Sequence, residues 1–175
     1  MRNLLRKPLT WVVLAVLGVG LVAGLWLFAP WKLFVDQTVD EALPSAAPAA
    51  TGTQTAAAAG PVLVSQGRFV THEHDTSGTA KLIKLPDGRY QLALEKLRTS
   101  NGPDLRVWLT DQAVTPDGWR VFDDGEYVEL GALKGNVGSQ VYDIPAKVDV
   151  TKYRSVTIWC KRFSVSFGAA ELATT

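Results

Sequence analysis

The chain is poor in the residues that most often carry redox or metal chemistry. It has one cysteine, one methionine and two histidines in 175 residues. With Cys160 as the only cysteine, no disulfide bond can form within the chain. There is no C-x-x-C-H run, which excludes covalent attachment of a c-type haem. There is also no serine nucleophile elbow and no metalloprotease motif, so the sequence indicates no hydrolysis and we assign no defined enzymatic reaction.

An excess of charge of one sign is also missing. The chain has 18 Lys and Arg against 17 Asp and Glu, a formal net charge of +1. Residues 61–175 carry 14 residues of each sign. A nucleic-acid-binding domain needs a basic field, and none is present. We therefore expect no nucleic-acid partner.

One long apolar run is present near the N-terminus. Residues 9–29 read LTWVVLAVLGVGLVAGLWLFA, with no charge and no proline. A helix of this length spans roughly 30 Å, the thickness of the bilayer core. The run ends in large side chains and not at a small-residue cleavage site, which predicts an uncleaved transmembrane anchor, with a cleaved signal peptide as the alternative. Three basic residues lie in residues 1–8, so the positive-inside rule predicts a single-pass protein of the cell membrane with its N-terminus cytoplasmic and its bulk extracytoplasmic.

Residues 30–60 differ in composition from both of their neighbours. From Glu41 to Gly60 they read EALPSAAPAATGTQTAAAAG, with almost no charge and little that could be buried. Such a segment cannot repay the entropy lost on ordering it. We expect a flexible Ala/Pro/Thr linker between the anchor and a domain at residues 61–175.

The domain has the pattern of an all-β protein. In DLRVWLT, residues 104–110, apolar residues alternate with others at the period of two that is typical of a strand. Turn sequences rich in Gly, Pro, Asn and Asp separate such runs. The runs are PVLVSQGRFV, TAKLIKL, RYQLAL, DLRVWLT, WRVF, YVELG, SQVYDIP, SVTIWC and FSVSFG. We predict a single antiparallel β-sandwich, with a partly open barrel as the alternative.

Cys160 lies in SVTIWCKRFSVSF, residues 155–167. Apolar residues 156 and 158 share one strand face with Cys160, whereas apolar residues 163, 165 and 167 have the opposite parity. One regular strand cannot bury both sets, so a bulge or a tight turn is predicted at Lys161–Arg162. Cys160 should then be the last inward-pointing residue before that break.

Two interpretations of Cys160 stay open at this stage. Free cysteine is among the most buried residue types and often packs as a small apolar side chain. Alternatively, Cys160 is a redox thiol, with Lys161 and Arg162 close enough to lower its pKa. Cys160 is therefore the one candidate catalytic residue.

The two histidines, His72 and His74, are candidates for a metal site with Cys160. Two imidazoles and a thiolate form the trigonal ligand set of copper electron-transfer proteins. Such sites draw a further ligand from residues after the cysteine, and no His or Met follows Cys160. We therefore predict no metal site, with both histidines away from Cys160, on the surface before the DTSG turn. A noncovalent haem on Cys160 or His72 is a further alternative, and the cofactor is unknown.

Trp108 and Trp159 fall on the outward faces of their predicted strands. They could form a recognition patch or lie under a neighbouring loop, and we favour the loop. The sequences NGPD at Asn101 and KGNVGSQ at Lys134 look like phosphate-binding loops, but no helix follows either. We interpret both as turns.

Several short motifs resemble the DM-thirteen (electron-transfer DM) domain, which is also found in Skeletor-type proteins and in bacterial membrane-anchored proteins. They occur in order across residues 67–172: GRF, H-x-x-SGTA, NGPDLRVWL, LGALKGNVGSQVYDIP and YRSVTIWCKRFSVSFGAAEL. The resemblance implies a β-rich fold and a role in electron transfer. It further implies that Cys160, within W-C-x-x-F, acts as a thiol or as a ligand.

Two functions therefore compete. The first is a membrane-anchored extracytoplasmic module with an electron-transfer or thiol-redox role centred on Cys160. The second is a non-catalytic surface binding or adhesion module in which Cys160 is a core packing residue. Apart from the membrane, reached through residues 9–29, the redox or surface partner is unknown. Accessibility of the sulfur distinguishes the two.

Overall fold

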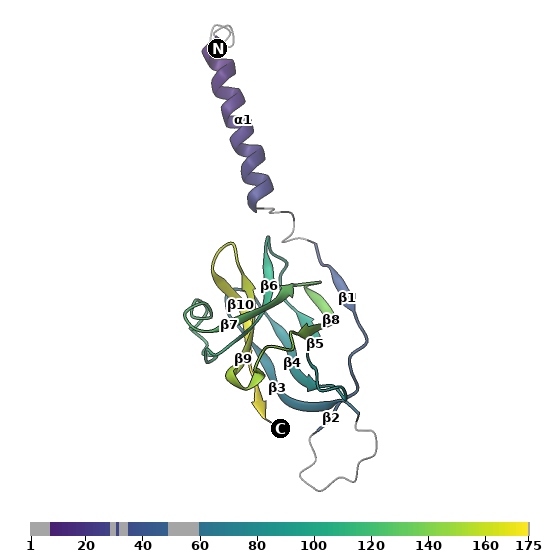
Figure 1. The fold of residues 1–175 in the computed structure, drawn as a ribbon. Coiled ribbons are helices and arrows are strands. Elements are labelled where there is room, and N and C mark those ends of the chain that lie inside the picture. Colours follow the sequence, from purple (N-terminus) through teal and green to yellow (C-terminus); the bar gives the residue numbers. More distant parts are fainter. Residues whose placement is uncertain (1–7, 29–30, 32–34, 49–59, 175) are drawn as a thin grey trace, which may run out of the picture.

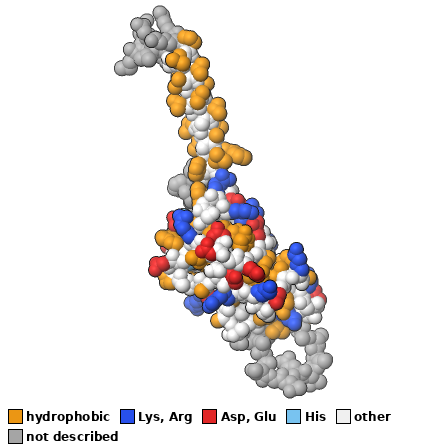
Figure 2. Space-filling view, turned by 60° about the vertical axis from the view of Figure 1, so that its left-hand side comes forward, with side chains coloured by type: hydrophobic (Ala, Val, Ile, Leu, Met, Phe, Trp, Pro, Cys, Tyr) orange, Lys and Arg blue, Asp and Glu red, His pale blue; other side chains and the backbone are white. Residues whose placement is uncertain are grey.

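The computed structural model describes residues 8–28, 31, 35–48 and 60–174, and Figure 1 shows an N-terminal helix that projects from one end of a β domain. Helix α1 is Pro8–Phe28, 21 residues long, and none of its residues is buried. Figure 2 shows apolar side chains along its whole length, whereas the visible face of the domain carries both charges. A helix that is apolar all round is suited to an apolar environment such as a membrane.

A path of nine hydrogen-bonded strands forms the domain, in the order β1-β8-β5-β4-β3-β10-β9-β6-β7. All neighbours are antiparallel except β1 with β8; off the path, β2 pairs parallel and β11 antiparallel with β3. The strands are β1 Thr38–Asp40, β2 Ala47–Pro48, β3 Val62–Thr71, β4 Ser77–Lys84, β5 Tyr90–Arg98, β6 Leu105–Thr110, β7 Tyr127–Ala132, β8 Val137–Ile144, β9 Ser155–Cys160, β10 Val165–Glu171 and β11 Ala173–Thr174.

The sheet curls because β3 has different partners along its length. Residues 62–68 pair with β4, whereas residues 69–71 pair with β10. Strand β7 then comes close to β8, which leaves a partly open barrel, called the barrel below. The all-β prediction is confirmed, and the curled sheet matches the open-barrel alternative. The helix described in residues 60–174 is the short 3-10 turn Val150–Lys152.

The barrel encloses the main core, to which strands from both halves of the curled sheet contribute. Its buried members include Leu92, Leu94, Val107, Ile158 and Cys160. Along β6, β9 and β10 nearly every residue is buried on both faces. A second layer must therefore cover the outside of these three strands.

That cover is the segment of residues 111–126, called the covering loop. Its Phe122 is fully buried against the outward-facing Trp108 and Trp159. The backbone of Trp119 accepts a hydrogen bond from the amide of Ser166 in β10, at 2.7 Å. The prediction of a strand at WRVF, residues 119–122, is wrong. An aromatic anchor in a loop gives the same apolar signal as a short strand.

Part of the expected linker, residues 30–60, is held on the barrel. Strand β1 pairs with β8, and β2 pairs with β3. The Glu41 carboxylate accepts hydrogen bonds from Lys134 Nζ at 2.8 Å and from the Val141 amide at 2.7 Å. Leu43 and Ala46 pack against a small apolar cluster on the outside of β3 and β4. Residues 49–59 of the expected linker lie outside the described residues.

Candidate functional site around Cys160

Cys160 is the last residue of β9 and lies at one end of the barrel. It pairs with Leu105 in β6 and with Val165 in β10, and none of its surface is exposed. The break predicted beside it is confirmed as a tight turn at residues 161–164, in which the Phe163 amide donates to the Cys160 carbonyl at 3.2 Å. Four turn residues separate Cys160 from Val165 and place the two opposite one another. The apolar positions therefore change from even to odd residue numbers after Cys160.

Residue 163 itself differs from the sequence prediction. Phe163 was expected to begin the strand FSVSFG and to point inward with Val165. It lies instead in the turn and is 44% exposed, because β10 begins only at Val165. Within β10 the register then shifts between Ser166 and Gly168, so that Phe167 also faces the main core.

The sulfur of Cys160 is held as a neutral thiol. Burial raises its pKa above the ordinary value, because a thiolate is poorly solvated inside the protein. The backbone amides of Phe163, Arg162 and Asp104 oppose this rise in pKa without cancelling it, and the Asp104 carboxylate adds to the rise. The neighbouring cations do not lower the thiol pKa as expected: the Lys161 ammonium lies 3.2 Å from the Glu129 carboxylate and both turn cations are exposed.

The loop of residues 101–104 closes this end of the barrel. The Asp104 carbonyl accepts a hydrogen bond from the Lys161 amide at 3.0 Å, which ties the loop to the turn after Cys160. A side chain at Gly102 would press on Phe167, so the loop lies directly on the core. The sequence suggested only a turn here. The contact between NGPD and the cysteine depends on strand pairing that no local motif reveals.

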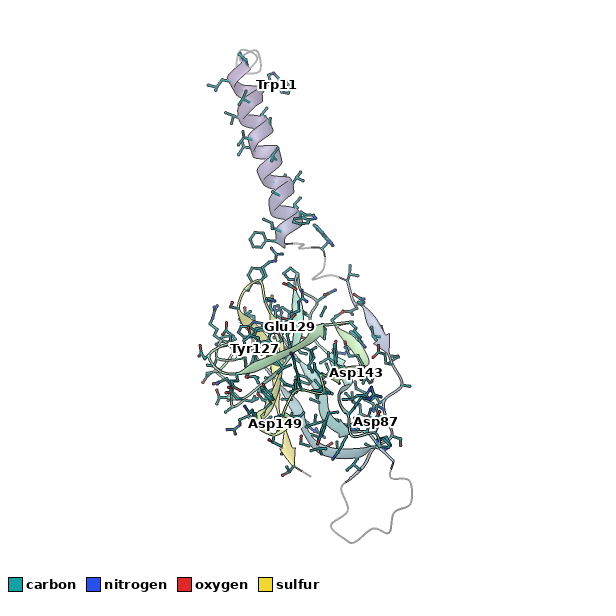
Figure 3. The ribbon with its side chains drawn as sticks, viewed as in Figure 1. Trp11, Asp87, Tyr127, Glu129, Asp143 and Asp149 are labelled. Carbon is teal, nitrogen blue, oxygen red and sulfur yellow. The ribbon has the colours of Figure 1, made fainter. Side chains whose placement is uncertain are left out.

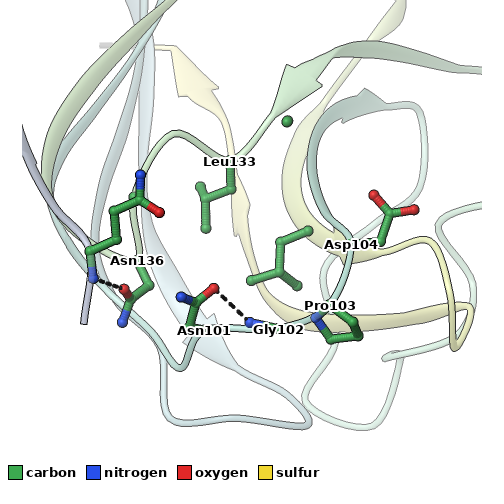
Figure 4. Close-up of a pocket in the computed structure, with 10 residues that line it drawn as sticks. Asn101, Gly102, Pro103, Asp104, Leu133 and Asn136 are labelled. Carbon is green, nitrogen blue, oxygen red and sulfur yellow. Dashed lines mark hydrogen bonds between the residues drawn. The ribbon is translucent and has the colours of Figure 1, made fainter. Parts of the chain in front are cut away.

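A small polar cleft adjoins this loop (Figure 4). It measures about 130 Å³ and is lined by Leu105, the strand neighbour of Cys160, and by the polar residues Asn101, Asp104 and Asn136. Cofactor pockets usually measure roughly 300–1,000 Å³. The cleft is therefore suited to a few water molecules or a small polar group, and it does not offer the space that a haem requires.

His72 is buried, so the expectation of a surface position is wrong for this residue. Its Nδ1 lies 2.8 Å from Ser166 Oγ and its Nε2 lies 3.0 Å from the Thr115 carbonyl. Burial lowers the pKa of its imidazole, partly offset by the Thr115 carbonyl, which favours the charged form. A neutral ring donates to Thr115 and accepts from Ser166, so His72 fastens the covering loop to β10.

His74 lies in a different environment, with its ring 3.9 Å from the ring of Phe167 between centroids. Both histidines follow the end of β3 at Thr71, so the two-residue periodicity of a strand does not apply to them. Within the part of the chain that the structure describes, no three His, Cys, Asp or Glu side chains are grouped to hold a metal ion.

Trp108 and Trp159 lie under the covering loop, as the sequence analysis favoured. Their rings stack at 5.1 Å between centroids, and Tyr127 stacks on Trp108 from outside at 4.0 Å. Trp108 Nε1 is the one buried side-chain nitrogen or oxygen of the described residues that has no hydrogen-bond partner. Sequence reasoning missed the role of Phe122, which depends on a loop folding back over the sheet, and that of Tyr127, which depends on the pairing of β7 with β6.

The model of the family described as "Electron transfer DM13" matches residues 68–172, more than half of the chain. The chain belongs to this family. The matched region runs from β3 to the residue after β10, so it includes the Cys160 turn, the covering loop and both histidines. No curated protein and no solved structure matches the chain.

One helix of the described residues, Pro8–Phe28, is long and apolar enough to cross a membrane. A signal sequence near the N-terminus would meet the same criteria of length and apolarity. The Electron transfer DM13 domain thus follows a segment that is a candidate membrane span or signal sequence.

Proposed function

We propose that this protein is a membrane-anchored, extracytoplasmic electron-transfer module in which Cys160 is the reactive group. Membership of the Electron transfer DM13 family is the observation that carries the electron-transfer role. In this proposal residues 1–8 are cytoplasmic, residues 9–29 form an uncleaved anchor, and residues 61–175 form the working domain.

The surroundings of the sulfur support a role for Cys160. The backbone amides of Phe163, Arg162 and Asp104 act to lower the pKa of the thiol, against burial and the Asp104 carboxylate, because amide donors favour the thiolate over the thiol. A thiolate, once formed, would therefore be held without a nearby side-chain cation. The polar cleft is lined by Leu105, the strand neighbour of Cys160, and not by Cys160 itself, so the thiol proton would reach water there only when this end of the barrel opens. Cys160 then gives up one proton to water and one electron to a one-electron acceptor carried by a partner, which leaves a thiyl radical, and the reverse transfer restores the thiol. As a ligand to a group on the partner, Cys160 would give up the proton alone.

Burial sets the condition for this chemistry. Because Cys160 is fully covered and its pKa is raised, the closed barrel keeps the thiol unreactive. Reaction requires a local opening of the loop at residues 101–104 or of the turn at residues 161–164. Such openings cost less free energy than global unfolding when they involve exposed segments.

The second candidate function is a surface binding module, and the same burial favours it. A fully covered thiol between Leu105 and Val165 is typical of a packing residue. In this case the exposed surface of the barrel binds the partner, and Cys160 only packs in the core.

Maleimide labelling of the full chain in lipid nanodiscs separates the two functions, since Cys160 is the only thiol. We expect labelling of the folded protein at a rate that does not change in low concentrations of urea, which is the signature of local opening. A labelling rate that rises steeply with urea concentration would mean that Cys160 reacts only after global unfolding. Together with an absorption spectrum free of any chromophore, that result would contradict the redox role and support the binding module.

The anchor and its orientation are tested separately. N-terminal sequencing of protein extracted from membranes should begin at or near Met1, and a start near residue 30 would show a cleaved signal. Protease added outside intact cells should remove the domain and leave the anchor. Protection of the domain would contradict the extracytoplasmic orientation.

A further inference from the structure

The chain leaves helix α1 and joins the barrel at the same end that carries Cys160. Val35 follows Phe28 by seven positions, so the two are separated by at most about 25 Å of extended chain. The Val35 carbonyl accepts a hydrogen bond from Asn101 Nδ2 at 3.3 Å, and the Gln37 amide donates to Asn136 Oδ1 at 2.7 Å. Strand β1 then continues this attachment along β8.

The loop that receives Val35 is the loop that closes over Cys160. Asn101 and Asp104 lie in this loop, and Asp104 is bonded in turn to Lys161. The attachment point, the loop and the turn at residues 161–164 therefore form one continuous end of the barrel. Figure 3 shows the opposite end, with Asp87 and Asp149, far from the helix.

The turn on this end has an unusual surface for an extracellular loop. Its four residues, 161–164, are all exposed. Two basic residues precede Phe163 in the turn, and a serine follows it. No residue of the turn is acidic. An apolar ring flanked by basic side chains is the composition of segments that lie in the membrane interface, where the ring enters the acyl boundary and the cations contact phosphates.

Phe163 also contacts the helix directly. Its ring stacks on that of Phe28, the last residue of α1, with 6.0 Å between centroids and 21° between planes. Phe28 ends the apolar helix, at the level where a membrane-spanning segment meets the headgroups. Two further exposed apolar residues, Trp31 and Val35, lie in the connection between helix and barrel.

We propose that the turn of residues 161–164 is a bilayer contact, with the Phe163 ring in the interface, Arg162 on lipid phosphates, and Lys161 shared between lipid phosphates and the Glu129 carboxylate 3.2 Å away. The Cys160 end of the barrel then faces the membrane, and a partner that reaches the sulfur through this turn approaches along the membrane surface. The inference rests on the proposed membrane anchoring and is independent of whether Cys160 transfers electrons.

The first test uses the unmodified full chain in phosphatidylcholine nanodiscs that contain a headgroup spin-labelled lipid. Amide signals of residues 161–164 should broaden at least fivefold more than those of residues 87–89, which form a turn at the opposite end. Equal broadening at both turns would overturn the proposal.

The second test places a benzophenone amino acid at position 163, 127 or 26 of the full chain in phosphatidylcholine vesicles. Tyr127 is the matched control, because it is aromatic and 44% exposed like Phe163, but lies on the side of the barrel (Figure 3). Irradiation should attach lipid at positions 26 and 163 and not at 127. Attachment at 26 without 163 would overturn the bilayer contact alone, whereas no attachment at 26 would overturn the anchor and the contact together. None of these outcomes bears on the redox test.

Discussion

Cys160 and Val165 oppose one another across the β9–β10 hairpin, with both side chains in the main core. The cysteine is thus part of the packing of the barrel whatever its chemistry. Its sulfur is separated from solvent by a turn and a loop, and not by a strand. Chemistry at this position requires a small local movement. The contribution of Cys160 to the free energy of unfolding can be measured by substitution.

Replacing Cys160 with Ser should leave the fold intact and lower the free energy of unfolding by about 1–3 kcal/mol, because a hydroxyl replaces a sulfur in a fully buried site. Urea unfolding of the full chain in nanodiscs measures this loss. Lys147→Ser serves as the control and should change stability by less than about 0.5 kcal/mol, since Lys147 is exposed and lies away from the Cys160 turn. Equal effects at the two positions would argue against the buried sulfur.

Gly67 lies where β3 passes the last residue of β10, Glu171. A Cβ atom at this position would overlap the carbonyl of Glu171, which is backbone and cannot swing aside. Gly67→Ala should therefore cost about 3 kcal/mol or prevent folding. Gly60→Ala, with no atom within 4 Å of its added Cβ, is the control. Thermal unfolding measures both, and a Gly67→Ala variant as stable as the parent would contradict this packing.

The stability of the domain should depend on the charge of His72. Its folded-state pKa lies below its ordinary value of 6.5, so the unfolded chain binds the proton more readily. The contribution of His72 is fully present above pH 6.5 and is lost as the pH falls through the lower folded-state pKa. Urea unfolding between pH 8 and pH 5 should show this decline.

Substitution identifies which histidine is responsible. In His72→Gln the side chain can still donate to the Thr115 carbonyl but does not titrate, so the decline should become shallower. The His74→Gln variant should show the same decline of stability with falling pH as the parent protein. If the decline stays the same in His72→Gln, His72 is not the group that titrates.

Glu41 should control how firmly the segment of residues 38–48 is held on the barrel. Glu41→Ala removes the acceptor of Lys134 and Val141, so amide hydrogen exchange in this segment should become faster. Glu126→Ala is the control, because Glu126 is exposed and lies 3.9 Å from Lys152. Unchanged exchange in Glu41→Ala would mean that strand pairing alone holds the segment.

The class of fold and the inward direction of Cys160 follow from the order of neighbouring residues alone. Alternation at a period of two specifies a strand with one buried face, and the change of parity after Cys160 requires a break there. Both features are local, so they can be read from consecutive residues. The length and uniform apolarity of residues 9–29 likewise indicated a membrane-compatible helix without reference to any other part of the chain.

The surroundings of Cys160, in contrast, come from parts of the chain that are distant in sequence. The amide of Asp104 acts on the pKa of the thiol through the pairing of β6 with β9, which joins residues more than fifty positions apart. His72 is buried because the covering loop, from another part of the chain, folds over it. Such contacts depend on strand order and on the path of loops, which hydrophobic periodicity does not specify. The raised pKa of the thiol follows from this enclosure and not from the charges beside it in the sequence.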